Sequence, residues 1–146
     1  MSAQQSAEAP CAVGRLTPQG PWIGFQPAAS GYRFVVGLNG MLRSFEADVD
    51  LLLALAIAYF TEAFEGAPPE IEATQADLSA LITDLARRET DAEARRLLRE
   101  ALDAIDDGLA GDAVAGRLAA ARPARTEPID PIELLRTRAM ELTATA

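Results

Sequence analysis

The chain has 146 residues, 49% of them hydrophobic and 24% charged, a composition that suits one globular domain and excludes wholesale disorder and collagen-like repeats. Its formal net charge is −9, and no basic stripe is long enough to offset the repulsion from a phosphate backbone, so we expect no nucleic-acid partner. The longest apolar run, 49–60, is well short of the about 20 residues that a spanning helix needs, so we expect no membrane span.

Two residue types are missing from the chain. It has no histidine, and all 13 of its basic residues are arginine. Without histidine there is no Ser–His or Cys–His pair and no imidazole metal ligand, and without lysine there is no Schiff base and no Walker-type phosphate contact. We therefore expect no enzyme activity from this chain alone, no cofactor and no metal site.

Residues 1–20 predict a flexible N-terminal tail. Its opening, Met1 to Pro10, is rich in Ser, Ala, Gln and Pro and lacks the basic and apolar regions of a secretory signal. Cys11 is the single cysteine, so it cannot form an internal disulfide, and it has no histidine partner that would make it a nucleophile. These features favour a cytoplasmic protein in which Cys11 is not catalytic.

A small β element is predicted over 21–45. Strand-forming residues flank Asn39-Gly40, a dipeptide that accepts the positive φ angles of a type I′ turn, so a β-hairpin is expected here. The segment 21–27 can add a third antiparallel strand. The aromatic residues of this region could stack on single-stranded nucleic acid, but in so acidic a chain we interpret them as core or as a protein interface.

Four helices are expected within 48–121. The first begins at Asp48 or Asp50, ends before Gly66 and is apolar nearly all round, which predicts the buried centre of the fold or of an interface. Capping boxes at 74–77 and 90–93 predict the starts of the second and third helices, and a short Ala-rich helix follows over 113–121.

The end of the chain predicts a tethered helix. Residues 123–129 have the composition of a linker, and Asp130-Pro131 is typical of a helix start, which gives a final helix over 130–146. One stripe of this helix is apolar and consists of Ile132, Leu135, Ala139 and Leu142. The helix can fold back on its own domain or dock onto another chain, and the linker favours docking.

Two acidic clusters could offer oxygen ligands to a divalent cation. Both lack the spacing of a dedicated site: the first is broken by two prolines, and the second lies at a helix end without a second acidic motif. We interpret the first as a solvated loop and the second as ordinary helix-end polarity. The two clusters are Glu62, Glu65, Glu70 and Glu72, and Asp103, Asp106, Asp107 and Asp112.

The predicted fold is α+β and predominantly α. A small N-terminal antiparallel β-hairpin or three-stranded meander precedes a four- to five-helix bundle. One domain is expected over 21–122, with its β element at 21–45 and its helices at 48–121, between the tail 1–20 and the linker 123–129 that leads to the last helix.

The composition favours a non-catalytic accessory, assembly or structural subunit of a larger bacterial or phage complex, which acts through apolar helix faces. Its partner would be another protein chain or a second copy. The alternative is a small-molecule-binding regulatory domain with a pocket near 22–59, or a minor subunit of an enzyme whose catalytic groups lie on another chain. The residues expected to bind a partner are Ile132, Leu135, Ala139, Leu142, Trp22 and Phe25.

Overall fold

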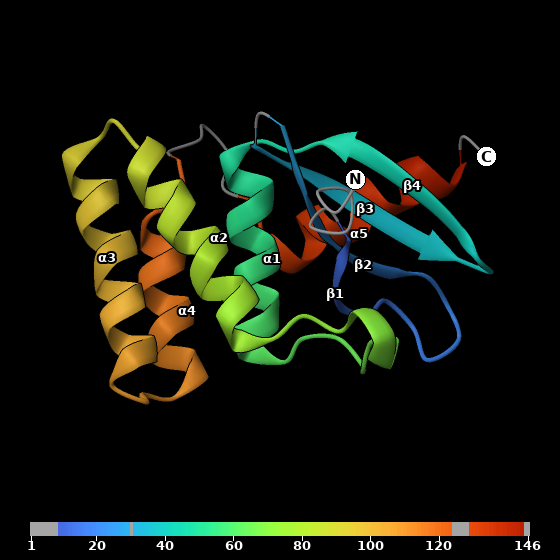
Figure 1. The fold of residues 1–146 in the computed structure, drawn as a ribbon, viewed down its shortest axis with the longest axis horizontal. Coiled ribbons are helices and arrows are strands. Elements are labelled where there is room, and N and C mark those ends of the chain that lie inside the picture. Colours follow the sequence, from blue (N-terminus) through green and yellow to red (C-terminus); the bar gives the residue numbers. More distant parts are fainter. Residues whose placement is uncertain (1–8, 30, 124–128, 145–146) are drawn as a thin grey trace, which may run out of the picture.

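A computed structural model describes residues 9–29, 31–123 and 129–144 of the chain. In this part of the chain a four-stranded sheet precedes five α-helices, which confirms the predicted α+β class. Figure 1 shows α1 between the sheet on one side and the α2, α3 and α4 helices on the other. The elements are β1 (Cys11–Arg15), β2 (Trp22–Ala28), β3 (Gly31–Leu38), β4 (Met41–Glu46), α1 (Val49–Thr61), the 3₁₀ turn η2 (Pro69–Ile71), α2 (Gln75–Arg88), α3 (Ala92–Asp106), α4 (Gly111–Ala120) and α5 (Pro131–Ala144).

The sheet is an antiparallel meander with strand order β1-β2-β3-β4. The predicted hairpin is confirmed: φ is 54° at Asn39 and 81° at Gly40, and Leu38 pairs with Met41 across the turn. Both angles are left-handed, as a type I′ turn requires. The sheet has one strand more than the three-stranded meander expected from the sequence.

The additional strand, β1, lies where the sequence predicts a flexible tail, so the predicted tail 1–20 is wrong for residues 11–15. Small residues give this segment little strand preference of its own. Its stability comes from pairing with β2, where the backbone approaches so closely that a Cβ on Gly24 would lie 1.9 Å from the Cys11 carbonyl oxygen. Residues 1–8 of the predicted tail lie outside the described residues.

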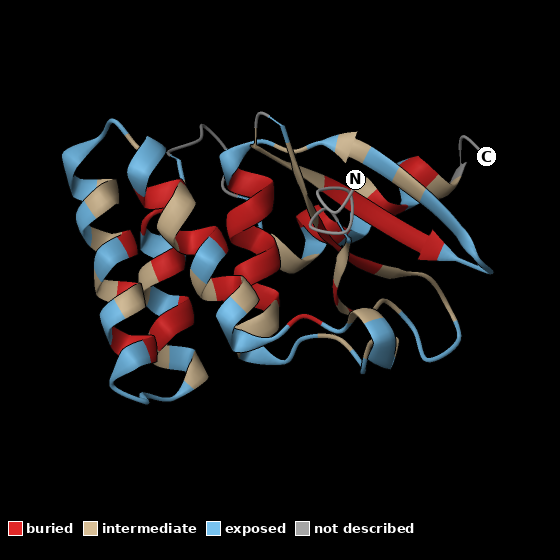
Figure 2. Ribbon diagram, in the orientation of Figure 1, coloured by how far each residue is buried: buried red, intermediate tan, exposed pale blue. Residues whose placement is uncertain are grey.

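Helix α1 is the centre of the fold. Every residue from 50 to 58 is buried, and Figure 2 shows burial along most of the length of this helix. Helices α4 and α5 pack against α1, and β1, β2 and β3 also contact it. A helix that is apolar nearly all round needs such cover on every side. Among the described residues no helix is both long enough and apolar enough to cross a membrane.

The helix starts follow the predicted caps closely. At α2 the capping box forms as predicted, because the Asp77 N–H donates to Thr74 Oγ1 (3.2 Å) and the Thr74 N–H donates to Asp77 Oδ2 (2.9 Å). At α3 the cap is Asp91, which accepts from the Ala94 N–H at 2.8 Å, rather than Thr90. Aspartate caps a helix at least as well as threonine, which explains this shift of one residue.

Among the described residues, one ion pair has a buried carboxylate. Asp50, in the first turn of α1, has 3% of its side chain exposed, and Arg122, just after α4, has 15% exposed. The Arg122 Nε donates to Asp50 Oδ1 at 2.6 Å, and its Nη2 donates to Asp50 Oδ2 at 3.3 Å. This two-point contact fastens the end of α4 to the start of α1.

We predict that Arg122→Ala lowers the free energy of unfolding by about 3 kcal/mol, because it takes a two-point partner from a buried carboxylate. Urea unfolding followed by Trp22 fluorescence measures the change. Arg96→Ala is the matched control: Arg96 contacts Glu93 and Glu100 on the exposed surface of α3, so its loss should change stability far less than the loss of Arg122. Equal effects of the two substitutions would contradict the structural role of the buried pair.

Candidate functional site

The residues predicted to bind a partner are mostly covered by the chain itself. Leu135 and Ala139 are fully buried, Leu142 is 6% exposed and Ile132 is half-buried, because α5 packs against α1 and contacts β3 and β4. Of the two arrangements considered for the last helix, the structure has the one that folds back. The predicted linker 123–129 lies mostly outside the described residues.

Trp22 and Phe25 lie in β2, in the interior of the sheet. Phe25 is 2% exposed and belongs to the core, where it makes an edge-to-face contact with Tyr32 at 6.0 Å between ring centroids. Trp22 is half-buried and lies across the backbone of Gly37, where a Cβ would come within 2.2 Å of the indole. These contacts give both aromatic residues a role within the sheet.

The two edges of the sheet differ. The β1 edge is covered by the segment that follows α1: the Arg15 N–H donates to the Glu65 carbonyl oxygen (3.0 Å), and the Ala73 N–H donates to the Ala12 carbonyl oxygen (2.8 Å). Along the outer side of β4 no described residue forms a ladder. We call this outer side of β4 the open edge.

Exposed apolar side chains gather at the end of the same hairpin. Leu38 is 37% exposed, Met41 58% and Leu42 47%, and together they form what we call the apolar tip. Figure 2 shows this tip as an exposed projection beyond the buried part of β3. A cavity of about 460 Å³ lies beside β4, with Arg33, Phe45 and Arg138 among its lining residues. The open edge and the apolar tip form the candidate surface, whereas the hollow lies at the other end of β4 and shares no lining residue with the tip.

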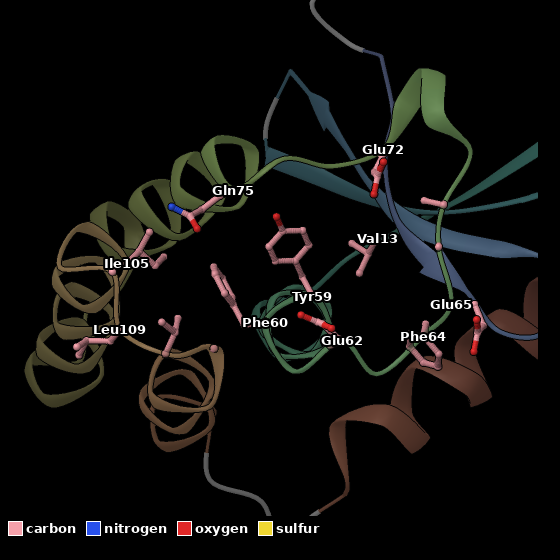
Figure 3. Close-up of a pocket in the computed structure, with 16 residues that line it drawn as sticks. Val13, Tyr59, Phe60, Glu62, Phe64, Glu65, Glu72, Gln75, Ile105 and Leu109 are labelled. Carbon is pink, nitrogen blue, oxygen red and sulfur yellow. The ribbon is translucent and has the colours of Figure 1, made fainter.

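A larger cavity, of about 610 Å³, lies at the C-terminal end of α1. We call it the acidic cavity, because Glu62, Glu65 and Glu72 line it and no arginine does. Figure 3 shows Tyr59 and Phe60 projecting into it from α1. The two rings meet edge to face, with centroids 5.0 Å apart and planes at 85°.

The sequence identified this cavity only in part. It singled out the glutamates of the segment as candidate cation ligands, but Glu70 does not line the cavity, and the described residues contain no group of three or more acidic or cysteine side chains placed to hold a metal ion. Tyr59 and Phe60, expected to be buried, are half-buried lining residues. Trp22 does not line the cavity, although a pocket was expected near 22–59.

The hydroxyl of Tyr59 is held in its neutral form. Burial raises the pKa of this phenol, and the negative charges of Glu72 and Asp77 raise it further. Tyr59 therefore brings an aromatic face and a neutral hydroxyl to the cavity. All the charge on its lining is carboxylate, which makes the cavity attractive to cations and repulsive to anions.

Cys11 is protected from ionisation. Burial, followed by the charge and a hydrogen bond of Asp77, raises the pKa of its thiol from 9.0 to about 11. We predict that iodoacetamide alkylates Cys11 about a hundredfold more slowly at pH 8 than it alkylates a thiol of pKa 9, since only the thiolate reacts. The rate should keep rising with pH up to about 11 in the folded chain. A plateau near pH 9 would contradict this environment, and the same measurement in urea supplies the reference.

Glu62 occupies a backbone position that favours glycine. It caps the end of α1 with φ of 52°, and a side chain in this left-handed region costs about 1 kcal/mol. We predict that Glu62→Gly raises the free energy of unfolding by about 0.5 kcal/mol, the gain being reduced by the extra freedom of glycine in the unfolded chain. Thermal unfolding tests this, and Glu62→Ala, which keeps the strain, should give no gain.

Comparison with protein-family models, with curated proteins and with solved structures finds no match to this chain. The open edge with its apolar tip and the acidic cavity are therefore interpreted by their own geometry and chemistry.

Proposed function

We propose that this chain is a non-catalytic accessory subunit that joins a larger protein complex by accepting an extended strand of a partner chain at the open edge of β4. The observation that carries the proposal is the difference between the two sheet edges. The chain covers the β1 edge with its own backbone, whereas the outer side of β4 has no ladder partner among the described residues. An uncovered edge offers a row of backbone donors and acceptors to another strand.

The apolar tip supports the same proposal. Met41 and Leu42 are successive strand residues, so their side chains point to opposite faces of the sheet, and both are about half exposed. A partner that adds a strand here can therefore bury apolar side chains on both faces of the hairpin. We propose a contact at the sheet edge rather than at α5, because the apolar stripe of α5 already packs within the chain.

The charge of the chain indicates what kind of partner fits. Strand β4 carries Arg43 and Glu46 and is neutral overall, while the whole chain has a formal charge of −9. A second copy would bring a second charge of −9 to the same edge. A different chain of net positive charge would instead be drawn in by long-range attraction, and the apolar tip would contribute short-range burial. We therefore commit to a basic partner chain with an extended apolar segment.

We predict that Leu42→Glu removes this partner. A charge at the tip opposes its burial, and this cost outweighs one added unit of screened long-range attraction to a basic partner, so the complex should weaken at least about tenfold. The measurement is affinity purification of the tagged full chain from its native host, followed by mass spectrometry of intact complexes. The wild-type chain should carry one stoichiometric partner of net positive sequence charge, and hydrogen exchange should show protection of β4 in that complex.

Leu109→Glu is the matched control. Leu109 is also a leucine with 47% exposure, and its α3–α4 loop lies at the opposite end of the molecule from the tip (Figure 1). It should retain the partner fully. Three results would each overturn the proposal. The partner is lost with both substitutions, the hydrogen exchange of β4 is the same with and without the partner, or the wild-type chain purifies alone.

A further inference from the structure

We propose that the acidic cavity binds a small organic cation, an ammonium or guanidinium group carried on an apolar body. This site lies apart from the open edge, and its ligand requires no protein partner. The cavity measures about 610 Å³, which is within the range of about 300–1,000 Å³ typical of small-molecule sites.

The walls of the cavity come from segments far apart in the sequence. Val13 of β1 and Glu72 lie on one side, and Ile105, at the end of α3, and Leu109, in the α3–α4 loop, lie on the other. Tyr59 and Phe60 project between these two sides, as Figure 3 shows. Aliphatic and aromatic side chains share the lining with carboxylate, amide and backbone polar atoms, so the cavity suits a ligand that carries a charged group on a small apolar body.

The aromatic rings favour a cation in particular. The face of an aromatic ring carries partial negative charge and attracts ammonium and guanidinium groups within about 6 Å of its centroid. The chain uses this interaction once among its described residues: the guanidinium carbon of Arg136 lies 5.7 Å from the centroid of Phe64, another ring that lines the cavity. Tyr59 and Phe60 have no such cation within the described chain.

The carboxylates also favour a positively charged ligand, for a reason that is independent of the rings. Glu62, Glu65 and Glu72 line the cavity, and in the described chain none of the three forms an ion pair with an arginine. The three residues are exposed, so water and salt screen their charge in part, and together they disfavour phosphate-bearing ligands by repulsion. A bare metal ion fits less well than an organic cation, because the described residues hold no cluster of three metal-binding side chains.

The experiment titrates the isolated full chain with choline and with agmatine, and it measures binding by calorimetry and by amide chemical shifts. The neutral analogue 3,3-dimethyl-1-butanol, in which carbon replaces the nitrogen of choline, is the comparison ligand. We expect at least one cation to bind with a Kd below about 10 mM and to shift the amide resonances of residues 59, 60 and 72. If choline binds, the neutral analogue should bind about tenfold more weakly. Mg²⁺ at matched ionic strength should leave these residues unshifted.

Two neighbouring glutamates supply the matched variants. Both residues are exposed, but only Glu72 lines the cavity. Glu72→Gln should therefore weaken cation binding about fivefold, whereas Glu70→Gln should leave it unchanged. Phe60→Leu keeps an apolar side chain but removes a ring face, and it should weaken the cation more than the neutral analogue.

Three results would overturn the cation site. They are the absence of any shift at residues 59, 60 and 72 with either cation, binding of the neutral analogue equal to that of choline, and equal losses in Glu72→Gln and Glu70→Gln. Urea unfolding followed by Trp22 fluorescence shows that each variant is folded before it is titrated. Since the titration uses the chain alone, its outcome is separate from that of the partner experiment.

Discussion

The architecture depends on the burial of α1. Residues 50–58 of this helix are all buried, so no side of it can be left facing water. The sheet meets this requirement on one side, and the other helices, including the final α5, meet it elsewhere. Asp50 is the buried polar residue of α1, and its contact with Arg122 joins the end of α4 to the same centre. The covering of α1 thus explains why α5 packs inward instead of extending toward a partner.

Local chemistry made much of this fold predictable from the sequence. Asn39-Gly40 specifies its turn by the φ angles that it accepts, and Thr74 and Asp77 specify a helix start by hydrogen bonds within four residues. The features that the sequence did not predict depend on contacts between distant segments. Strand β1 has almost no strand preference and forms because β2 and the 65–73 segment lie on either side of it. The acidic cavity could be predicted only as a row of glutamates, because its other walls come from β1, α1, α2 and the α3–α4 region.

The two proposed surfaces lie in parts of the chain that differ in charge. Residues 9–45, which contain the whole sheet except the end of β4, carry three arginines and no acidic residue. The following stretch, 46–86, carries nine acidic residues and no basic one, and it includes the glutamates of the acidic cavity. The chain therefore has a sheet whose one acidic residue is Glu46, at the end of β4, next to a helical region that is rich in acidic residues. A basic partner is therefore attracted by the net charge of the whole chain and not by the sheet itself, whereas a cationic ligand meets acidic residues directly at the cavity.

The cover over β1 also limits how many chains an assembly could contain. A sheet with two open edges can add a strand on each side, and repeated addition leads to an open-ended filament. Here the backbone of Glu65 and Ala73 already occupies the β1 side, so a strand can be added only next to β4. This chain can therefore take up one added strand at its sheet and no more. A molecule with this asymmetry can terminate a growing sheet but cannot propagate one.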